Sequence, residues 1–355
     1  MKILYCLLLS ISIIFVSTNT SAFELALKHE LLIKHETYAP TVIYTPNGEF
    51  LLLNVGDKQA CLISVQGDIK DLQFQGYVNS DRLISGQDSI YFFAGNTLTT
   101  LSNQGEISLL EQVKFPTSYG LHVNPSEQYI LSGSYEISNL LQLTKPTLWL
   151  DIEAFGPSLE FEIGDEILTF RRDVASWFFD TSMLKAWSLA NANLINKTEV
   201  NGDITSHKIL NEEKSIITYT VGNTLRFWDY KNNKILKQKI EYNDSIYLEK
   251  FYDQTWLFSE GKMYNISWQD NKAHAVLVND KGVKLTSKAN FSADGKYALL
   301  DESPNAEKKL VLYEIKENKF TKLFDINEPT TSYSLNPTKR ELAIYNDKKL
   351  KIYSF

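Results

Sequence analysis

Hydrophobic segments recur along this sequence with a period of about 41 residues. Each segment is a short run of β-branched and aromatic residues, then a polar turn, then a second such run. Their leading apolar residues are Leu62, Leu98, Leu148, Leu184, Leu225, Met263, Leu310 and Leu350. Seven intervals, from 36 to 50 residues long, cover the 288 residues between the first and the last. A period of this length indicates a repeat architecture built from small supersecondary units.

A second pattern has the same spacing. Four segments share a polar turn followed by a hydrophobic run: Pro46–Leu52, Pro125–Leu131, Ala293–Leu299 and Pro337–Ala343. Their starts are 79, 168 and 44 residues apart, close to two, four and one steps of one unit. Turn residues break the hydrophobic runs every eight to twelve residues, and no long amphipathic helical pattern occurs. The sequence therefore predicts an all-β chain.

The sequence resembles the WD-repeat family of β-propellers, whose four-stranded blades recur every 40–45 residues. The family's Trp-Asp pair occurs once, as Trp228-Asp229 in the segment Thr224–Leu236, and no Gly-His pair precedes a blade. The family's Asp-His-Ser-Trp network is therefore not expected here. Quinoprotein-like propellers have similar outer hairpins, so that resemblance stays open. Both imply one propeller of four-stranded antiparallel blades.

Eight blades are favoured by the eight leading residues. Seven is the alternative, because Glu136–Ile163 can be parsed as one insertion or as parts of two repeats. Each blade buries its faces only against neighbours, so the ring must close. The last unit, Ser332–Phe355, supplies about three strands. We expect its missing outer strand to be Glu30–Glu36, which contains Leu31-Leu32-Ile33.

The first 22 residues have the pattern of a cleaved signal peptide. A charged start, Met1-Lys2, precedes the apolar stretch Ile3–Val16 and the small-residue stretch Ser17–Ala22. The apolar stretch is shorter than the roughly 20 residues that a membrane-spanning helix needs. We therefore expect cleavage after Ala22, a propeller domain over residues 23–355 without a membrane span, and a periplasmic or secreted location. Lysine outnumbers arginine 31 to 5, which favours a bacterial source.

Charge and cysteine content exclude several classes of protein. A formal net charge of −7 gives no overall attraction for nucleic acid or anionic lipid. Two cysteines exclude a disulfide-stapled scaffold and a four-cysteine zinc site. Cys6 lies in the predicted signal, and Cys61 is expected to be a small buried residue.

Motifs of catalysis and metal binding do not emerge from the sequence. His29 and His35 are six residues apart, about 20 Å along a strand, which is too far to share a metal ion. Neither a Gly-x-Ser-x-Gly elbow nor a phosphate-binding glycine loop occurs. We therefore expect no cofactor and no metal, although a site assembled from distant loops at the centre of a propeller would escape this search.

Two charged segments are candidates for binding. Six carboxylates and no basic residue occupy Asp151–Glu166, where the alternation in Leu159–Ile163 favours a half-exposed strand over a cation site. Arg171 and Arg172 are two of only five arginines and could form an anion site, although successive strand residues face opposite ways. They are the candidate binding residues.

The sequence and the resemblance together favour an exported, monomeric, non-enzymatic propeller that binds another protein as a scaffold. A hydrolase-like or lactonase-like enzyme with its site at the central channel is one alternative. An outer-membrane assembly factor resembling quinoprotein-like propellers is the other. A fold alone does not determine function, so these alternatives stay open.

Overall fold

Four-stranded sheets make up the described part of the chain. The computed structural model describes residues 25–34, 40–56, 58–75, 77–78, 83–112, 121–133, 137–142, 149–153, 159–175, 180–191, 193–251, 254–259, 262–279, 290–301, 310–316, 319–327 and 329–355. These residues form strands, turns and bends, with no helix among them. The predicted signal peptide, residues 1–22, lies outside the described residues.

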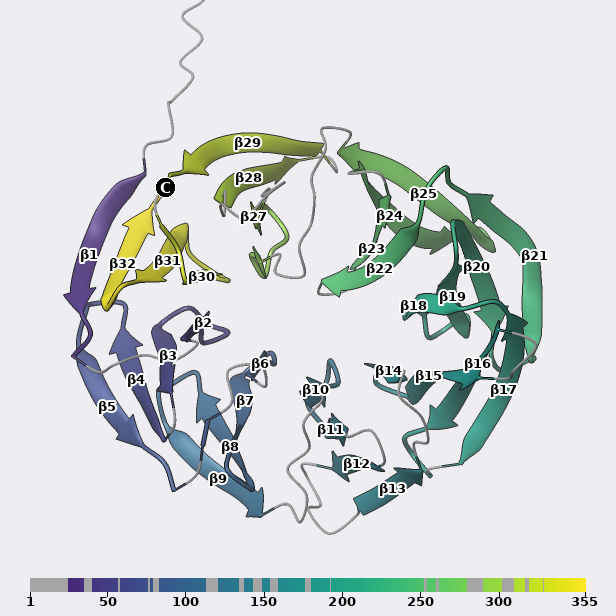
Figure 1. Cartoon of the computed structure of the whole chain (residues 1–355), viewed down its shortest axis with the longest axis horizontal. Coiled ribbons are helices and arrows are strands. Elements are labelled where there is room, and N and C mark those ends of the chain that lie inside the picture. Colours follow the sequence, from purple (N-terminus) through teal and green to yellow (C-terminus); the bar gives the residue numbers. More distant parts are fainter. Residues whose placement is uncertain are drawn as a thin grey trace, which may run out of the picture.

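The strands fall into four layers, from the centre of the molecule to its periphery (Figure 1). The innermost layer consists of β2 (Thr41–Tyr44), β6 (Ile84–Ser85), β10 (Leu121–Val123), β14 (Leu159–Ile163), β18 (Ile204–Asn211), β22 (Ile246–Phe251), β26 (Asn290–Phe291) and β30 (Ser332–Leu335). The second layer consists of β3 (Phe50–Gly56), β7 (Ser89–Ala94), β11 (Tyr129–Gly133), β15 (Ile167–Ala175), β19 (Ile216–Val221), β23 (Gln254–Ser259), β27 (Tyr297–Asp301) and β31 (Glu341–Asn346). The third layer consists of β4 (Gln59–Ser64), β8 (Thr97–Ser102), β12 (Ile137–Gln142), β16 (Asp180–Ser188), β20 (Thr224–Asp229), β24 (Lys262–Gln269), β28 (Leu310–Lys316) and β32 (Lys349–Ser354). The outer layer consists of β5 (Ile69–Gln73), β9 (Ile107–Gln112), β13 (Trp149–Glu153), β17 (Leu194–Asn201), β21 (Lys234–Glu241), β25 (Lys272–Asn279), β29 (Lys319–Ile326) and β1 (Ala26–Leu32).

These strands form eight four-stranded sheets arranged around a common centre (Figure 1). Seven sheets consist of four consecutive strands, so that the first begins at β2 and the seventh ends at β29. The eighth has the order β1-β32-β31-β30 and joins both ends of the described chain. The prediction of an all-β chain built from four-stranded antiparallel sheets is confirmed.

The two sequence patterns lie at equivalent places in the sheets. The four polar-turn segments join the first and second strands of the first, third, seventh and eighth sheets. All but one of the leading apolar residues lie on third strands. Leu148 lies outside the described residues, and the strand that follows it, β13, is an outer strand. The placement of this unit was therefore wrong, because six residues separate β12 from β13 and the apolar start of β13 resembles a leading run.

The stretch Glu136–Ile163 belongs to two sheets. Strands β12 and β13 pair with each other in the third sheet, and β14 begins the fourth. The structure thus divides this stretch between two units and does not treat it as one insertion.

Strand β1 corrects the expected position of the N-terminal strand. It spans Ala26–Leu32 rather than Glu30–Glu36, and it pairs with β32 from Ala26 opposite Ser354 to Leu32 opposite Lys349. Residues 35–36 lie outside the described residues. The apolar run at Leu31 marks the end of the strand and not its middle, because an outer strand is mostly exposed and needs no continuous apolar pattern.

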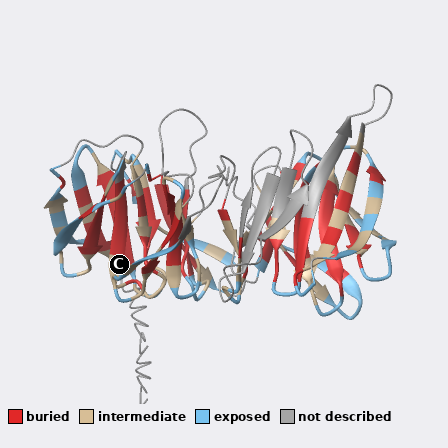
Figure 2. Ribbon diagram, turned by 90° about the horizontal axis from the view of Figure 1, so that it is seen from below, coloured by how far each residue is buried: buried red, intermediate tan, exposed pale blue. Residues whose placement is uncertain are grey.

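Packing between neighbouring sheets supplies the core, and Figure 2 shows its buried residues in the interior of the coloured strands. Alternate residues of β3 point to opposite faces: Leu51 and Leu53 pack against the eighth sheet, and Leu52 packs against the second. The second strands are therefore hydrophobic almost throughout. The cluster between the eighth and first sheets includes Ile33, just after β1, and Leu350 of β32. Burying one such side chain stabilises the fold by about 1.5–3 kcal/mol.

Candidate functional site

A cavity of about 630 Å³ lies at the centre of the molecule, where the innermost strands end. Its lining comes from seven of the eight sheets. The lining residues are Ile43, Tyr44, Pro46, Ile84, Ser85, Gly86, Gln87, His122, Val123, Asn124, Pro125, Glu162, Ile163, Lys250, Asn290, Phe291, Ala293, Ser334, Leu335 and Pro337. Each of these seven sheets contributes one to four described residues. The cavity is the candidate functional site.

Charged side chains from three consecutive sheets meet at one side of this cavity. The carboxylate of Glu162, on β14, lies 3.5 Å from Lys208 Nζ on β18 and 3.8 Å from Lys250 Nζ on β22. The side chains of Glu162 and Lys208 are only 12% and 10% exposed, and that of Lys250 is 22% exposed. Desolvated charges require a partner, and Glu162 is the shared partner of both ammonium groups.

Behind this cluster lies a buried polar contact between the fourth and fifth sheets. Thr169 Oγ1 lies 3.0 Å from Nε2 of His207, which is fully buried. The hydroxyl of Ser206 accepts the backbone N–H of Leu248, on the sixth sheet, at 2.8 Å. These contacts join neighbouring sheets, so we assign His207 a structural role.

Tyr44, the last residue of β2 in the first sheet, also lines the cavity. Burial raises the pKa of its phenol, and the negative charge of Glu341 raises it further. Tyr44 therefore stays protonated and neutral throughout the physiological range, and its hydroxyl oxygen is buried.

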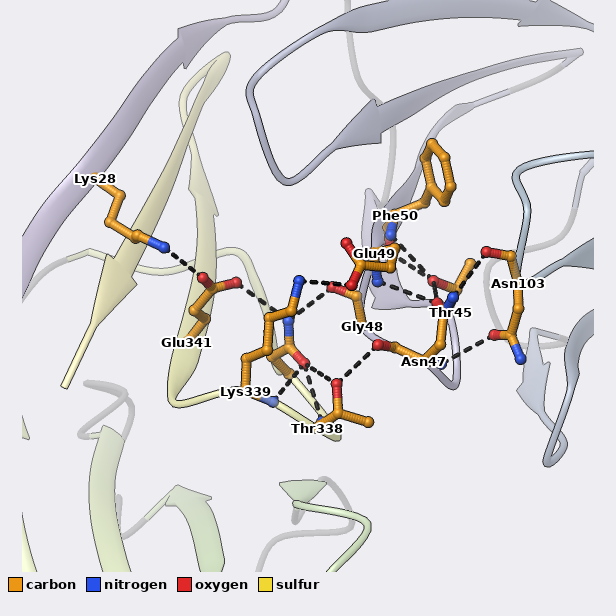
Figure 3. A network of polar contacts seen from close by, with 11 residues as sticks. Lys28, Thr45, Asn47, Gly48, Glu49, Phe50, Asn103, Thr338, Lys339 and Glu341 are labelled. Atoms are coloured by element: carbon orange, nitrogen blue, oxygen red, sulfur yellow. Dashed lines mark hydrogen bonds and ion pairs between the residues drawn. The ribbon is translucent and has the colours of Figure 1, made fainter.

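The rim of the cavity is formed by the turns between first and second strands, called inner turns below. Hydrogen bonds and an ion pair join neighbouring inner turns (Figure 3). Asn336 Nδ2 donates to the Gly48 carbonyl at 2.9 Å, and Thr338 Oγ1 donates to the Asn47 carbonyl at 2.7 Å. An ion pair of 2.8 Å joins Lys339 to Glu49. These contacts join the eighth sheet to the first.

Carboxylates make similar contacts between the inner turns of the second to fifth sheets. Glu127 accepts the backbone N–H of Asp88 at 2.8 Å and the Tyr91 hydroxyl at 2.7 Å. Asp165 accepts the Ser126 N–H at 2.8 Å. Glu212 accepts three consecutive N–H groups, those of residues 165–167, at 3.1–3.3 Å. In each pair the carboxylate belongs to the sheet that follows in the sequence. The same kind of hydrogen bond therefore joins the second sheet to the third, the third to the fourth and the fourth to the fifth.

The predicted candidate arginines lie on β15, which pairs with β14. Arg171 is opposite Glu160 and Leu184, and Arg172 is opposite Leu159 and Met183. They occupy consecutive strand positions, as expected. Their binding role stays a prediction.

The acidic segment Asp151–Glu166 contains structural residues that the sequence did not reveal. Glu162 is the carboxylate between the two lysines, and Asp165 holds the inner turn of the third sheet. The expected strand is present as β14, and the Glu162 and Asp165 side chains contact protein partners. No sequence motif marks them, because their partners lie about 40 or more residues away.

Histidines are dispersed through the described chain. His29 is on β1, His122 lines the cavity, His207 is buried and His274 is exposed on β25; His35 is outside the described residues. In the described ranges no three His, Cys, Asp or Glu side chains gather as a metal site.

Comparisons with known proteins bear on the fold. No protein-family model matches the sequence, and no curated protein matches it. Among solved structures, the Dos1 propeller matches with a TM-score of 0.58 at 12% identity, over 94% of this chain and 96% of that one. The β-propeller domain of Myceliophteria thermophila Cps50 (Swd1) matches with a TM-score of 0.53 at 13% identity, over 94% of this chain and all of that one.

The fold is a β-propeller. The predicted propeller fold is confirmed, and the likeness extends over 94% of the chain. The part of this propeller that the structure describes has no helix with the length and hydrophobicity to cross a bilayer.

Proposed function

We propose that this protein is an exported, non-enzymatic β-propeller that binds another protein and acts as a scaffold. The observation that carries the proposal is the propeller fold over nearly the whole chain, which leaves the loops at the two ends of the sheets as broad surfaces. Repeat proteins commonly use such extended surfaces for binding. The scaffold acts as a monomer.

The proposal includes a closed ring of eight blades. Eight four-stranded sheets, the pairing of β1 with β32 and the hydrophobic cluster between the last and first sheets support it. An ion pair of 2.5 Å between Lys28 on β1 and Glu341 on β31 adds a side-chain contact across the same sheet. A closed ring leaves no sheet without a neighbour.

Export rests on the signal-like segment at residues 1–22. Its charged start, short apolar core and small-residue end support removal of the segment and a periplasmic or secreted domain over residues 23–355. Cys61 is the only cysteine of that domain, so the domain forms no internal disulfide. Strand pairing at the junction of its ends, rather than a disulfide, would then stabilise it in this location.

Affinity capture of the protein from its own compartment, together with metal analysis, tests the scaffold. We expect the same protein partner in repeated captures and no stoichiometric metal. Arg171→Ala and Arg172→Ala, compared with Arg340→Ala as a control, test whether the candidate arginines contribute to that binding. A stoichiometric metal with no reproducible partner would contradict the scaffold and favour the enzyme.

One observation favours a second candidate, a hydrolase-like or lactonase-like enzyme. The axial cavity has the size of a small-molecule site, and it brings His122 together with charged residues from other sheets. An outer-membrane assembly factor differs from the main proposal in its partner alone, so the identity of the captured protein separates the two.

A further inference from the structure

Two buried polar atoms in the fifth sheet have no hydrogen-bond partner in the protein. They are the hydroxyl oxygen of Tyr219 and Nε of Arg226. Tyr219 is fully buried in the hydrophobic cluster between the fourth and fifth sheets. Buried polar groups in native proteins are almost always satisfied, by protein atoms or by a bound water or ion, because an unsatisfied one destabilises the folded state.

Strand pairing places these two side chains side by side. Tyr219 on β19 is directly opposite Arg226 on β20, and the Cβ atoms of such a pair are about 5 Å apart on one face of the sheet. Trp228, two residues after Arg226, belongs to the same cluster as Tyr219, so this is the face that packs against the fourth sheet. A single ligand on this face can therefore contact both groups.

The positive charge of Arg226 is not neutralised by an ion pair. The described part of the chain provides no carboxylate within ion-pair distance of its guanidinium. The nearby carboxylate of Glu241 is exposed and already pairs with Lys239 Nζ at 2.6 Å. Lys239 is itself opposite Arg226 on β21, so the neighbouring strand adds a second cation.

Tyr219 does not supply the missing negative charge. Burial raises the pKa of its phenol to about 12, although the charge of Arg226 opposes this rise. The phenol therefore keeps its proton and can donate a hydrogen bond, as the Nε–H group of arginine does. Two donors without an acceptor, one of them cationic, suit a ligand that accepts hydrogen bonds and has a negative charge.

We propose that a small inorganic anion, chloride, binds between the fourth and fifth sheets and accepts hydrogen bonds from Tyr219 and Arg226. A single-atom ion suits this place because the surrounding side chains belong to a packed hydrophobic cluster. This site is independent of the protein-binding surfaces proposed above, so either proposal can fail alone.

Thermal unfolding of the whole protein tests this site, with sodium chloride compared with sodium gluconate at equal ionic strength. A ligand that binds only the folded state raises the unfolding midpoint by mass action. We expect a saturable rise with chloride and none with gluconate, which is too large for a place inside the cluster. In crystals soaked in sodium bromide, we expect an anomalous peak between the Tyr219 hydroxyl and Arg226 Nε.

Three variants separate this site from a general effect of salt. Tyr219→Phe keeps the ring and removes one donor, so chloride should bind about tenfold more weakly. Arg226→Gln removes the charge and should abolish the difference between chloride and gluconate. Tyr230→Phe is the matched control, because Tyr230 lies in the same cluster but its hydroxyl donates to the Glu212 carbonyl at 3.5 Å. This variant should keep the full response to chloride.

Three results would overturn the proposal. One is an equal midpoint of the unmodified protein in chloride and in gluconate. Another is an unchanged response to chloride in folded Tyr219→Phe, whose retained ring preserves the packing. The third is a water molecule, without anomalous signal, between the two side chains in the bromide-soaked crystals.

Discussion

At the residue scale, Glu212 shows how one side chain joins two sheets. Its carboxylate accepts the N–H groups of residues 165–167 and comes so close to Gly164 that a Cβ there would lie 2.1 Å from Oε1. Gly86 has the same relation to Glu127, with a distance of 2.0 Å. A larger residue at either of these two inner turns would displace the carboxylate that fills this place.

Replacement of Glu212 measures how much these hydrogen bonds stabilise the fold. Glu212→Ala is expected to lower the free energy of unfolding by about 1–2 kcal/mol, because three N–H groups lose a charged acceptor but regain water. Glu213→Ala is the control, since Glu213 is exposed and should change the free energy by less than about 0.5 kcal/mol. Equal effects of the two variants in urea unfolding would contradict the assigned role.

Cys61 gives a prediction about reactivity and pH. Burial raises the pKa of its thiol to about 12, with a further contribution from Asp71. The native thiol is therefore protonated at pH 8 and should not react with a disulfide reagent until urea unfolds the chain. Since the unfolded thiol loses its proton above its ordinary pKa of about 8.5, this group lowers stability as the pH rises from there toward 12. Rapid reaction of the native protein would contradict this.

At the element scale, β1 depends on pairing rather than on its own sequence. Glu341 is nearly buried and holds Lys28 at 2.5 Å while it accepts a bond from Asn336 at 3.2 Å. Glu30 on β1 and Lys349 on the adjacent strand β32 form a second ion pair, 3.2 Å long, with both side chains well exposed. The first pair therefore contributes more to stability than the second.

Two matched variants test this difference. Glu341→Gln is expected to cost about 1–2 kcal/mol, because a nearly buried carboxylate loses its ion pair while half-exposed Lys28 stays hydrated. Glu30→Gln should cost less than about 0.5 kcal/mol, the usual value for an exposed pair. Urea unfolding compares them directly, and a larger cost for Glu30→Gln would refute the ranking.

How far the sequence predicts each element depends on its layer. Second strands such as β3 and β19 are buried on both faces, so they appear as hydrophobic runs that mark the period. Outer strands such as β1 are mostly exposed and leave no such mark, which explains the four-residue error in its start. The third strand of the third sheet, β12, was missed because the outer strand that follows it, β13, begins with apolar residues. The leading residue of this unit was therefore assigned next to β13.

The candidate site could not be predicted from the sequence. Glu162, Lys208 and Lys250 come from three strands about 40 residues apart, and each looks like an ordinary polar residue of an alternating strand. Only the arrangement of sheets around one centre brings them together. Histidines and arginines are rare in this chain and were therefore considered first. The charged cluster at the cavity contains two lysines, which are common in this chain.

At the scale of the whole molecule, the central claim is that the eight sheets form one closed ring that depends on β1. Each described cluster of the core lies between two neighbouring sheets, as between the first and second or between the seventh and eighth. In a closed ring every sheet supports its neighbours, so loss of one strand at the junction affects the far side as well.

The most direct measurement is urea unfolding of the protein with and without residues 24–36, followed by tryptophan fluorescence. All six tryptophans lie between Trp149 and Trp268 in the sequence, and the five within the described residues lie in the third to sixth sheets, remote from β1. Leu32→Ser is the control, because this side chain on the same strand is 68% exposed and should leave the transition unchanged. The closed ring predicts a markedly lower midpoint for the deletion, or no folded protein at all. A deletion variant with the same midpoint and slope as the intact protein would contradict it.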